Sequence, residues 1–213
     1  ISWAEKNALD FSEAWEALGM KGDIIGLDKS LLEEAKKLAA KYDGSMGGPG
    51  HIDFIYNAVR ILNAKHVVET GVAYGWSSLA ILAGFLENND CQLCSVDMSY
   101  PKRNNDNFVG IVVPERYHKN WKIIDRPDIT GLPQALKLIG GQIDLCHYDS
   151  DKSIEGRSFA YPILWKSLRS GGLFISDDIA DNLCFAEFVK NTGAPFCVVK
   201  VKGKQYMGAI RKP

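Results

Sequence analysis

The sequence predicts a doubly wound α/β fold: a mostly parallel seven-stranded sheet with helices on both faces, an antiparallel C-terminal hairpin and added N-terminal helices. Two observations predict this fold. From residue 66 onward, short apolar runs alternate with helical patterns, which is typical of parallel strands joined by right-handed crossovers. Residues 195–210 (PFCVVKVKGKQYMGAI) read as two strands joined near Gly203, which predicts an antiparallel pair at or near a sheet edge.

The helices are predicted from the spacing of apolar side chains. Trp3, Phe11 and Trp15 lie near helical spacing in the first segment, and Asp28 is a suitable N-terminal residue for the second helix. A glycine-rich loop (GSMGGPG, 44–50) separates this second helix from the third. In order, we expect helices over residues 2–18, 31–42, 51–62, 76–87, 130–139, 154–169 and 181–191.

The strands are predicted where apolar and β-branched runs are bounded by turn residues. Before the hairpin, they cover residues 66–70, 92–97, 121–125, 143–149 and 173–178. The chain has 213 residues, which suits one core better than two α/β domains. We therefore expect a single domain over 1–213, with N-terminal helices in 1–63 and the α/β core in 64–213.

The composition excludes some classes of protein. The net charge of −1 gives no argument for binding to nucleic acid or to a membrane. The five cysteines are an odd number and lie mostly in apolar segments, which predicts reduced thiols and a cytoplasmic protein. No apolar run reaches the length of about 18 residues that a membrane span needs, and no signal peptide is visible. Since the first residue is Ile1 and not Met, residues upstream of it are left open.

Residues suited to binding a ligand follow the first two strands of the core. In open α/β sheets, ligands bind beyond the carboxyl ends of the strands. Gly71 and Gly75 allow a tight turn and a close approach of the backbone, and Ser77 offers a hydroxyl at the start of the next helix. Asp97 ends the second strand, where an acid can hold the hydroxyls of a ribose. Alternatively, the glycines serve only to pack a helix on a strand.

The segment Glu69–Ser77 resembles the first motif (E-x-G-x-x-x-G-x-S) of class I S-adenosylmethionine-dependent methyltransferases. The resemblance implies a Rossmann-like methyltransferase fold, with the loop from Gly71 to Gly75 under the methionine part of the cofactor. The cofactor-binding residues that it implies are Glu69, Gly71, Gly75, Ser77, Asp97, Met98, Asp128 and Ser150, among which Asp128 matches the family pattern loosely.

Three carboxylates follow the fourth and fifth strands. Asp149 ends one strand, and Asp177 and Asp178 end the other. If these strands are neighbours, their ends lie about 5 Å apart and the carboxylates repel one another. A divalent cation relieves this repulsion, and hard oxygen ligands suit Mg²⁺, Mn²⁺ or Ca²⁺. Alternatively, Asp149 starts a turn and the Asp177–Asp178 pair caps the following helix.

The same segments, YDSDKSIEG and ISDDI, resemble the metal-dependent catechol-type and caffeoyl-CoA-type O-methyltransferases. The resemblance implies that Asp149, Asp177 and Asp178 are metal ligands, that Lys152 is the catalytic base, and that Asp149 also takes part in catalysis. The sequence departs from the pattern of this family at one position and resembles a second family as well. Asp178 stands where the family usually has Asn, and the segment also resembles a methyltransferase family with D-G-D-H-S-Y-E-G, in which a His replaces Lys152.

We therefore expect an S-adenosylmethionine-dependent, divalent-metal-dependent O-methyltransferase that acts on a small-molecule hydroxyl, with Mg²⁺ as the first candidate for the metal. The resembled family favours homodimers. The long connection 98–120, with Tyr100, is expected to cover the acceptor. His147 is expected to be buried behind the site. The alternatives are a metal-independent methyltransferase, a non-catalytic protein that binds S-adenosylmethionine, and, least favoured because G-x-G-x-x-G is absent, a nicotinamide dehydrogenase.

Overall fold

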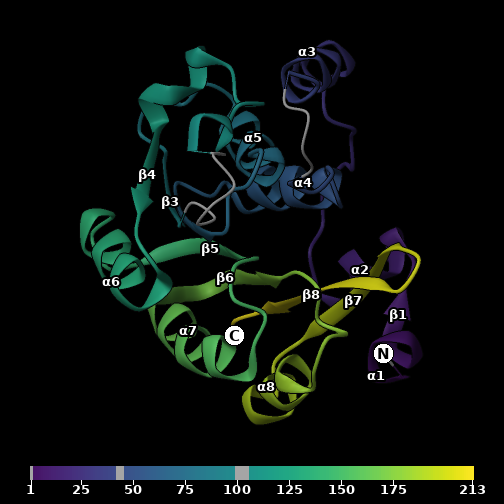
Figure 1. Cartoon of the computed structure of the whole chain (residues 1–213). Helices are drawn as coiled ribbons and strands as arrows, with labels where there is room; N and C mark the ends of the chain where they lie inside the picture. Colours follow the sequence, from purple (N-terminus) through teal and green to yellow (C-terminus); the bar gives the residue numbers. More distant parts are fainter. Residues whose placement is uncertain (1, 42–45, 99–105) are drawn as a thin grey trace.

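The structure is a computed structural model that describes residues 2–41, 46–98 and 106–213. Within these residues, eight strands form one sheet in the order β1-β7-β8-β6-β5-β2-β3-β4 (Figure 1). The strands are β1 (Ala8–Leu9), β2 (His66–Thr70), β3 (Gln92–Asp97), β4 (Trp121–Asp125), β5 (Ile143–Tyr148), β6 (Leu168–Ser176), β7 (Phe196–Lys202) and β8 (Gln205–Arg211).

The helices lie between the strands, as the sequence predicts. None of the helices in the described ranges is long and apolar enough to cross a membrane. The α-helices are α1 (Ser2–Asn7), α2 (Phe11–Ala17), α3 (Lys29–Ala39), α4 (Ile52–Leu62), α5 (Trp76–Gly84), α6 (Asp128–Leu138), α7 (Ile154–Ser167) and α8 (Cys184–Thr192), and the 3₁₀ helices are η1 (Asp106–Phe108) and η2 (Glu115–Asn120).

The pairing of the strands confirms the doubly wound fold. Strands β2 to β6 pair in parallel, whereas β8 pairs antiparallel with both β6 and β7. The hairpin turn contains Gly203 with φ +57°, a conformation that glycine adopts without steric cost. The antiparallel C-terminal pair therefore lies near one edge of the sheet, as predicted.

The N-terminal segment differs from the continuous helix predicted over residues 2–18. Ala8 and Leu9 leave the helical conformation and pair in parallel with β7, which adds an eighth strand to the seven that were predicted. Asp10 then starts a new helix, because its side chain accepts a hydrogen bond from the N–H of Glu13 while the Glu13 side chain accepts one from the N–H of Asp10. Helical spacing of the apolar residues did not reveal this break.

A second difference concerns the two glycines at the start of β6. The sequence predicts that Gly171 and Gly172 separate a helix from a strand, but β6 already begins at Leu168, which pairs with Ile143. A Cβ atom on Gly172 would lie 2.8 Å from the carbonyl oxygen of Asp144. The glycine thus allows two strands to approach at an irregular point in their register.

Each face of the sheet is covered by its own group of helices. Figure 1 shows α4 and α5 on one side of the sheet and α7 and α8 on the other. Alternate residues of each strand enter the two cores: Val67 packs with the α4–α5 group, and its neighbour Val68 packs with the α6–α7 group. This alternation is the period of two that an extended strand requires.

The order of the strands reverses next to β2, which has β3 on one side and β5 on the other. Ligands of open α/β sheets bind at such a point, beyond the carboxyl ends of the strands. Strands β5 and β6 are hydrogen-bonded neighbours, and Tyr148 is opposite Ser176. Asp149 and Asp177, the residues that follow these two, therefore leave the sheet side by side.

Candidate functional site

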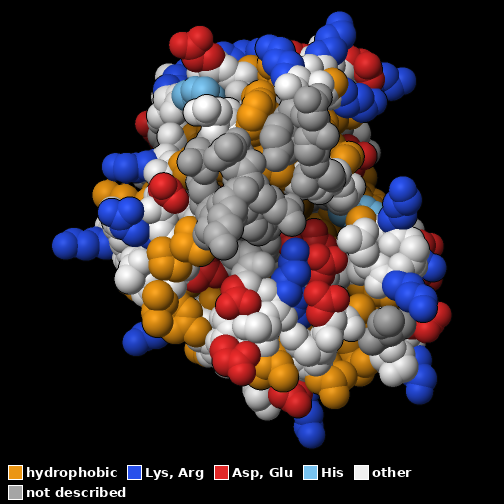
Figure 2. Space-filling model, in the orientation of Figure 1, with side chains coloured by type: hydrophobic (Ala, Val, Ile, Leu, Met, Phe, Trp, Pro, Cys, Tyr) orange, Lys and Arg blue, Asp and Glu red, His pale blue; other side chains and the backbone are white. Residues whose placement is uncertain are grey.

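A pocket of about 1240 Å³ lies at the carboxyl ends of the parallel strands. In Figure 2, acidic side chains gather around a basic one near the middle of the face shown. Three parts of its lining are distinguished by their residues. The first comprises Gly71, Ala73, Asp97, Met98, Asp128, Ile129 and Ser150, the second comprises Asp149, Lys152, Asp177 and Asp178, and the third includes Met46, Gly50, Val201, Lys202 and Gln205.

Gly71 brings two strand ends into contact. Its φ of +81° is a left-handed conformation that favours glycine. A Cβ atom at this position would lie 2.7 Å from the carbonyl carbon of Asp149, so no side chain fits there. Gly75 has φ +89° and immediately precedes α5. Both glycines are therefore required by the path of the backbone, and Gly71 also lines the pocket.

Asp97 holds the backbone of the glycine loop. Its Oδ2 atom accepts hydrogen bonds from the N–H groups of Val72 and Ala73, at 2.6 and 2.9 Å. Burial raises the pKa of Asp97, and these two hydrogen bonds oppose that effect. Asp97 thus fixes the loop and lines the pocket at the same time.

Asp128 and Ser150 form a second polar group at this end of the pocket. The hydroxyl of Ser150 donates to Asp128, and it also lies 2.9 Å from the hydroxyl oxygen of Thr70. Burial raises the pKa of Asp128, although the hydrogen bond from Ser150 opposes the shift. Met98, which the sequence also assigns to this end, is 51% exposed on the rim.

Glu69 and Ser77 do not line this pocket. Glu69 is fully buried, and its carboxylate accepts hydrogen bonds from the hydroxyls of Ser77, Ser78 and Ser95, at 2.5, 2.5 and 2.7 Å. The register of the sheet explains this group, because Ser95 and His147 are the direct neighbours of Glu69 on β3 and β5. In this structure, Glu69 therefore joins two strands and helix α5 beneath the pocket.

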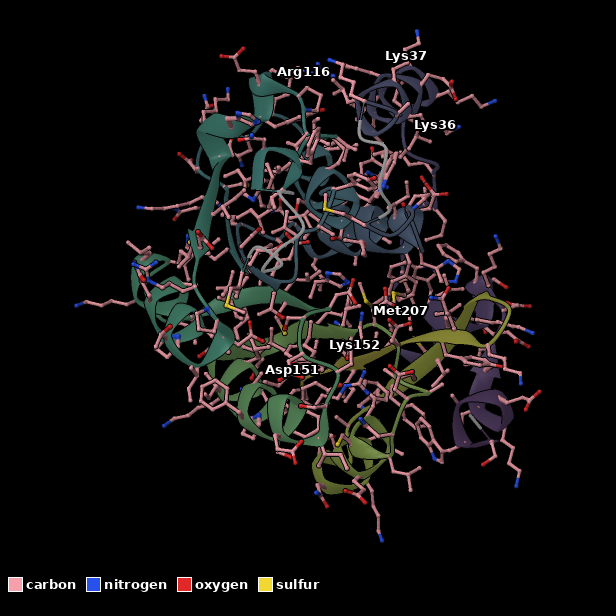
Figure 3. The ribbon with its side chains drawn as sticks, viewed as in Figure 1. Lys36, Lys37, Arg116, Asp151, Lys152 and Met207 are labelled. Carbon is pink, nitrogen blue, oxygen red and sulfur yellow. The ribbon has the colours of Figure 1, made fainter. Side chains whose placement is uncertain are left out.

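Lys152 lies between two of the three predicted ligand carboxylates. Its Nζ atom is 2.9 Å from Oδ1 of Asp149 and 2.8 Å from Oδ2 of Asp178. Burial lowers the pKa of Lys152, but the charges and hydrogen bonds of Asp149 and Asp178 outweigh burial and raise the pKa above its ordinary value. Figure 3 shows Lys152 near the middle of the molecule, whereas Lys36, Lys37 and Arg116 lie at its outer edge.

Asp177, the third predicted ligand carboxylate, is partly buried. Burial raises its pKa to about 6, and the negative charge of Asp149 adds to the shift. His147 lies behind it, almost fully buried, with Nδ1 3.6 Å from Oε1 of Glu69. Burial lowers the pKa of His147, but the carboxylate of Glu69 outweighs this and raises it. The negative charges of Asp149 and Asp178 are thus close enough to Asp177 to disfavour the ionised form of Asp177.

The donor chemistry of Asp149, Asp177 and Asp178 suits a hard divalent cation, because all three residues line the same pocket and carry carboxylate oxygens. However, no three His, Cys, Asp or Glu side chains among the described residues are arranged around a common point as metal ligands. The Lys152 ammonium is the positive charge that now contacts Asp149 and Asp178. A cation that used these two carboxylates would require Lys152 to give up both contacts.

Some residues near the site were not predicted from the sequence. Ser78 and Ser95 bond to Glu69, and Arg157 contacts the backbone of Asp177 and Asp178. The sequence did carry a signal for Arg157, since it lies at helical spacing with the buried residues Ala160, Tyr161 and Leu164 of α7. A charged residue on a buried helical stripe needs polar partners. Tyr100, which was expected to cover the acceptor, lies outside the described residues.

Comparison with protein families shows which family the chain belongs to. The sequence profile of a family described as "Methyltransferase domain" matches residues 68–179 of the 213, which is more than half of the chain and includes most of the residues that line the pocket. The chain therefore belongs to this family and is a methyltransferase, which confirms the class predicted from the sequence. None of the curated proteins compared with the chain matches it in sequence.

Solved structures with the same fold include O-methyltransferases. One from Bacillus cereus, in complex with S-adenosylhomocysteine, has a TM-score of 0.67 at 16% identity, over 98% of this chain and 100% of the other. TomG from Streptomyces achromogenes, an O-methyltransferase involved in tomaymycin synthesis and solved with S-adenosylmethionine, has a TM-score of 0.63 at 14% identity, over 99% of each chain. A candidate caffeoyl-CoA O-methyltransferase from Staphylococcus aureus has a TM-score of 0.61 at 15% identity, over 86% of this chain and 93% of the other. These similarities confirm the Rossmann-like methyltransferase fold.

Proposed function

We propose that this methyltransferase is an S-adenosylmethionine-dependent O-methyltransferase that acts on a small-molecule hydroxyl with the help of a divalent cation. The observation that carries the proposal is the single pocket that joins two kinds of residue. Gly71, Asp97 and Asp128 line one part of it, and Lys152 lies among Asp149, Asp177 and Asp178 in the next part. A cofactor bound at the first part would therefore have beside it the charged residues that we propose to bind the methyl acceptor.

The first part of the pocket suits the adenosine and methionine portions of the cofactor. The glycine loop brings backbone to the pocket wall, and Asp97 and Asp128 offer carboxylates to hydroxyl and amino groups. When bound, S-adenosylmethionine supplies an electrophilic methyl group on its sulfonium sulfur. Transfer of this methyl group to an acceptor oxygen leaves S-adenosylhomocysteine. The pocket's volume of about 1240 Å³ exceeds the usual 300–1000 Å³ of a site for one small molecule, so a cofactor and an acceptor fit together.

Lys152 is proposed to accept the proton of the acceptor hydroxyl at its Nζ atom. In the present geometry Asp149 and Asp178 raise its pKa, so Lys152 rests as an ammonium and holds its proton. It becomes a base only when these carboxylates contact something else. Bound to the oxygens of Asp149, Asp177 and Asp178, a divalent cation would supply the positive charge that lowers the pKa of the acceptor hydroxyl.

A second candidate function is methyl transfer without a metal. It is favoured by the contacts of Lys152, which already places a positive charge within 2.9 Å of Asp149 and Asp178. In this case Lys152 stays protonated and stabilises a developing oxyanion through its N–H groups. Asp177, whose pKa is raised to about 6, then remains as the proton acceptor beside it.

The test measures binding and transfer separately. Calorimetry with S-adenosylhomocysteine, and with NAD as the control ligand, tests the cofactor, and we expect binding of the first alone. Transfer of labelled methyl groups to a catechol-like acceptor is then assayed with added Mg²⁺ and with a chelator. Loss of transfer in the chelator supports the metal-dependent reaction. Transfer that resists the chelator supports the second candidate, and cofactor binding without transfer to any hydroxyl acceptor contradicts both.

A further inference from the structure

Arg157 on α7 is a fully buried arginine. Its guanidinium forms no ion pair with any carboxylate in the described part of the chain, and its Nε atom has no hydrogen-bond partner there. Burying a charge in this way is unfavourable unless polar groups surround it. The groups that do contact Arg157 therefore indicate what it does.

The first contacts of Arg157 are backbone carbonyls of the acid pair. Its Nη2 atom donates to the carbonyl oxygen of Asp178 at 2.8 Å and to that of Asp177 at 3.2 Å. Asp178 has φ +48°, a left-handed conformation that a non-glycine residue rarely adopts without support. Arg157 thus binds the carbonyls and not the carboxylates, and both Asp177 and Asp178 line the pocket.

The second contact connects Arg157 to Lys152. Its Nη1 atom donates to the side-chain oxygen of Asn182 at 3.3 Å, and the Asn182 amide donates to the carbonyl oxygen of Lys152 at 2.8 Å. Arg157 thus holds the loop after β6 directly, and through Asn182 it also holds the loop after β5. The 2.8 Å contact between Lys152 and Asp178 joins the same two loops on the pocket side.

We infer that Arg157, together with Asn182, is a positioning residue for the reaction: it fixes Asp177, Asp178 and Lys152 relative to one another without contacting substrate or cofactor. The inference rests on the proposed function for its catalytic meaning. Its geometric content, that the Lys152–Asp178 contact depends on Arg157 and Asn182, does not. A planar guanidinium can donate hydrogen bonds to two carbonyls and to an amide oxygen at the same time. A lysine ammonium cannot reproduce this planar arrangement of donors.

The test compares Arg157→Lys and Asn182→Ala with wild type, well below the melting temperature of each variant. Asn182 is only half-buried, so its variant keeps the inference testable if Arg157→Lys fails to fold. We expect kcat for methyl transfer to fall at least about 10-fold in each variant, since small misplacements of reacting groups are costly. We expect KM for S-adenosylmethionine to change less than about threefold, because Gly71, Asp97 and Asp128 in the cofactor part of the pocket lie on other elements.

Arg169→Lys is the matched control. Arg169 also joins distant segments, through Asp144 and the carbonyl of Leu62, but none of these residues lines the pocket. We expect its variant to lose stability and to keep kcat within about twofold of wild type. If the Arg157 and Asn182 variants also keep kcat, or lose no more than Arg169→Lys does, their role is merely structural and the inference is wrong.

Crystal structures of the variants with S-adenosylhomocysteine separate this inference from the proposed function. We expect the distance from Lys152 Nζ to Asp178 Oδ2, 2.8 Å here, to exceed 4.0 Å, the limit for an ion pair, in Arg157→Lys and Asn182→Ala but not in Arg169→Lys. If wild type transfers no methyl group, the proposed function fails and this distance still decides the inference. An unchanged distance in both variants would overturn it.

Discussion

Gly71 at the end of β2 lies directly against the backbone of Asp149 at the end of β5: a Cβ atom on Gly71 would be 2.7 Å from the carbonyl carbon of Asp149. This contact joins the glycine loop to the loop that carries Lys152. We predict that Gly71→Ala lowers the free energy of unfolding by about 2–4 kcal/mol, since it adds strain at a positive φ to a steric overlap. Chemical denaturation measures this loss.

Gly141→Ala is the control for that variant. Gly141 has a similar φ of +85°, but nothing lies within 4 Å of the position its Cβ would take. It should therefore lose only the strain, about 1 kcal/mol, and bind S-adenosylhomocysteine as wild type does. Gly71→Ala should bind this ligand more weakly. Equal losses of stability in the two variants would show that the close approach of Gly71 to Asp149 does not contribute to the free energy of unfolding.

Lys152→Arg separates the charge of Lys152 from its ability to give up a proton. Arginine can still pair with Asp149 and Asp178, which lie within 2.9 Å of the lysine nitrogen, but it stays protonated in proteins. We predict a melting temperature near that of wild type and a loss of methyl transfer of at least about 100-fold, a usual contribution of a general base. The exposed Lys166→Arg should change neither quantity. Turnover retained in Lys152→Arg would exclude Lys152 as the base.

Asp177→Asn should stabilise the protein while it removes activity. The pKa of Asp177 is raised to about 6 by burial and by the charge of Asp149, so the ionised form is disfavoured in the folded state. This penalty is full above about pH 6 and disappears as the pH falls toward the ordinary pKa of 3.8. We predict a gain of about 1–2 kcal/mol at about pH 8 in chelator, because a shift of one pKa unit corresponds to about 1.4 kcal/mol.

Thermal unfolding over a range of pH checks this prediction. The gain of Asp177→Asn should shrink between about pH 8 and pH 4, because Asp177 of the wild type then becomes protonated. The exposed Asp181→Asn, four residues further along the chain, is the control and should leave the melting temperature at about pH 8 nearly unchanged. A loss of stability in Asp177→Asn at about pH 8 would mean that the hydrogen bond from the N–H of Asp178 to Asp177 outweighs the repulsion.

The positions of the pocket residues could be predicted because they follow strands. Asp97, Asp128, Asp149 and Asp177 all stand at or just after the ends of parallel strands, and such ends meet at one edge of the sheet. The sequence identifies these ends through the change from apolar to polar residues. The sequence alone left the adjacency of β5 and β6 as an assumption, and their pairing shows that they are neighbours. The alternation of strands and helices specifies only the fold class.

Which side chains pair with one another could not be predicted. Glu69 stands at a strand end beside the glycine loop, yet the register between β2 and β3 places Ser95 opposite it, and the two form a buried hydrogen bond. A shift of one residue would have turned Glu69 to the other face of the sheet. The sequence does not specify this register, nor the contacts between loops that give Arg157 its carbonyl partners.

Asp144 provides the last prediction, at the opposite end of the sheet from the pocket. Its carboxylate accepts hydrogen bonds from Arg169 and from the N–H groups of Lys65 and His66. Burial raises the pKa of Asp144, but these donors outweigh burial and hold the pKa below its ordinary value of 3.8. Its stabilising effect is therefore present above that value and is lost as the pH falls through the lower pKa of the folded state.

We predict that Asp144→Asn costs about 1–2 kcal/mol at about pH 7, after allowance for solvent around the partly exposed Arg169, and much less at about pH 2. Urea denaturation at both pH values measures the difference, and methyl transfer at about pH 7 should remain within about twofold of wild type. A cost that is the same at both pH values would show that the charge of Asp144 does not contribute.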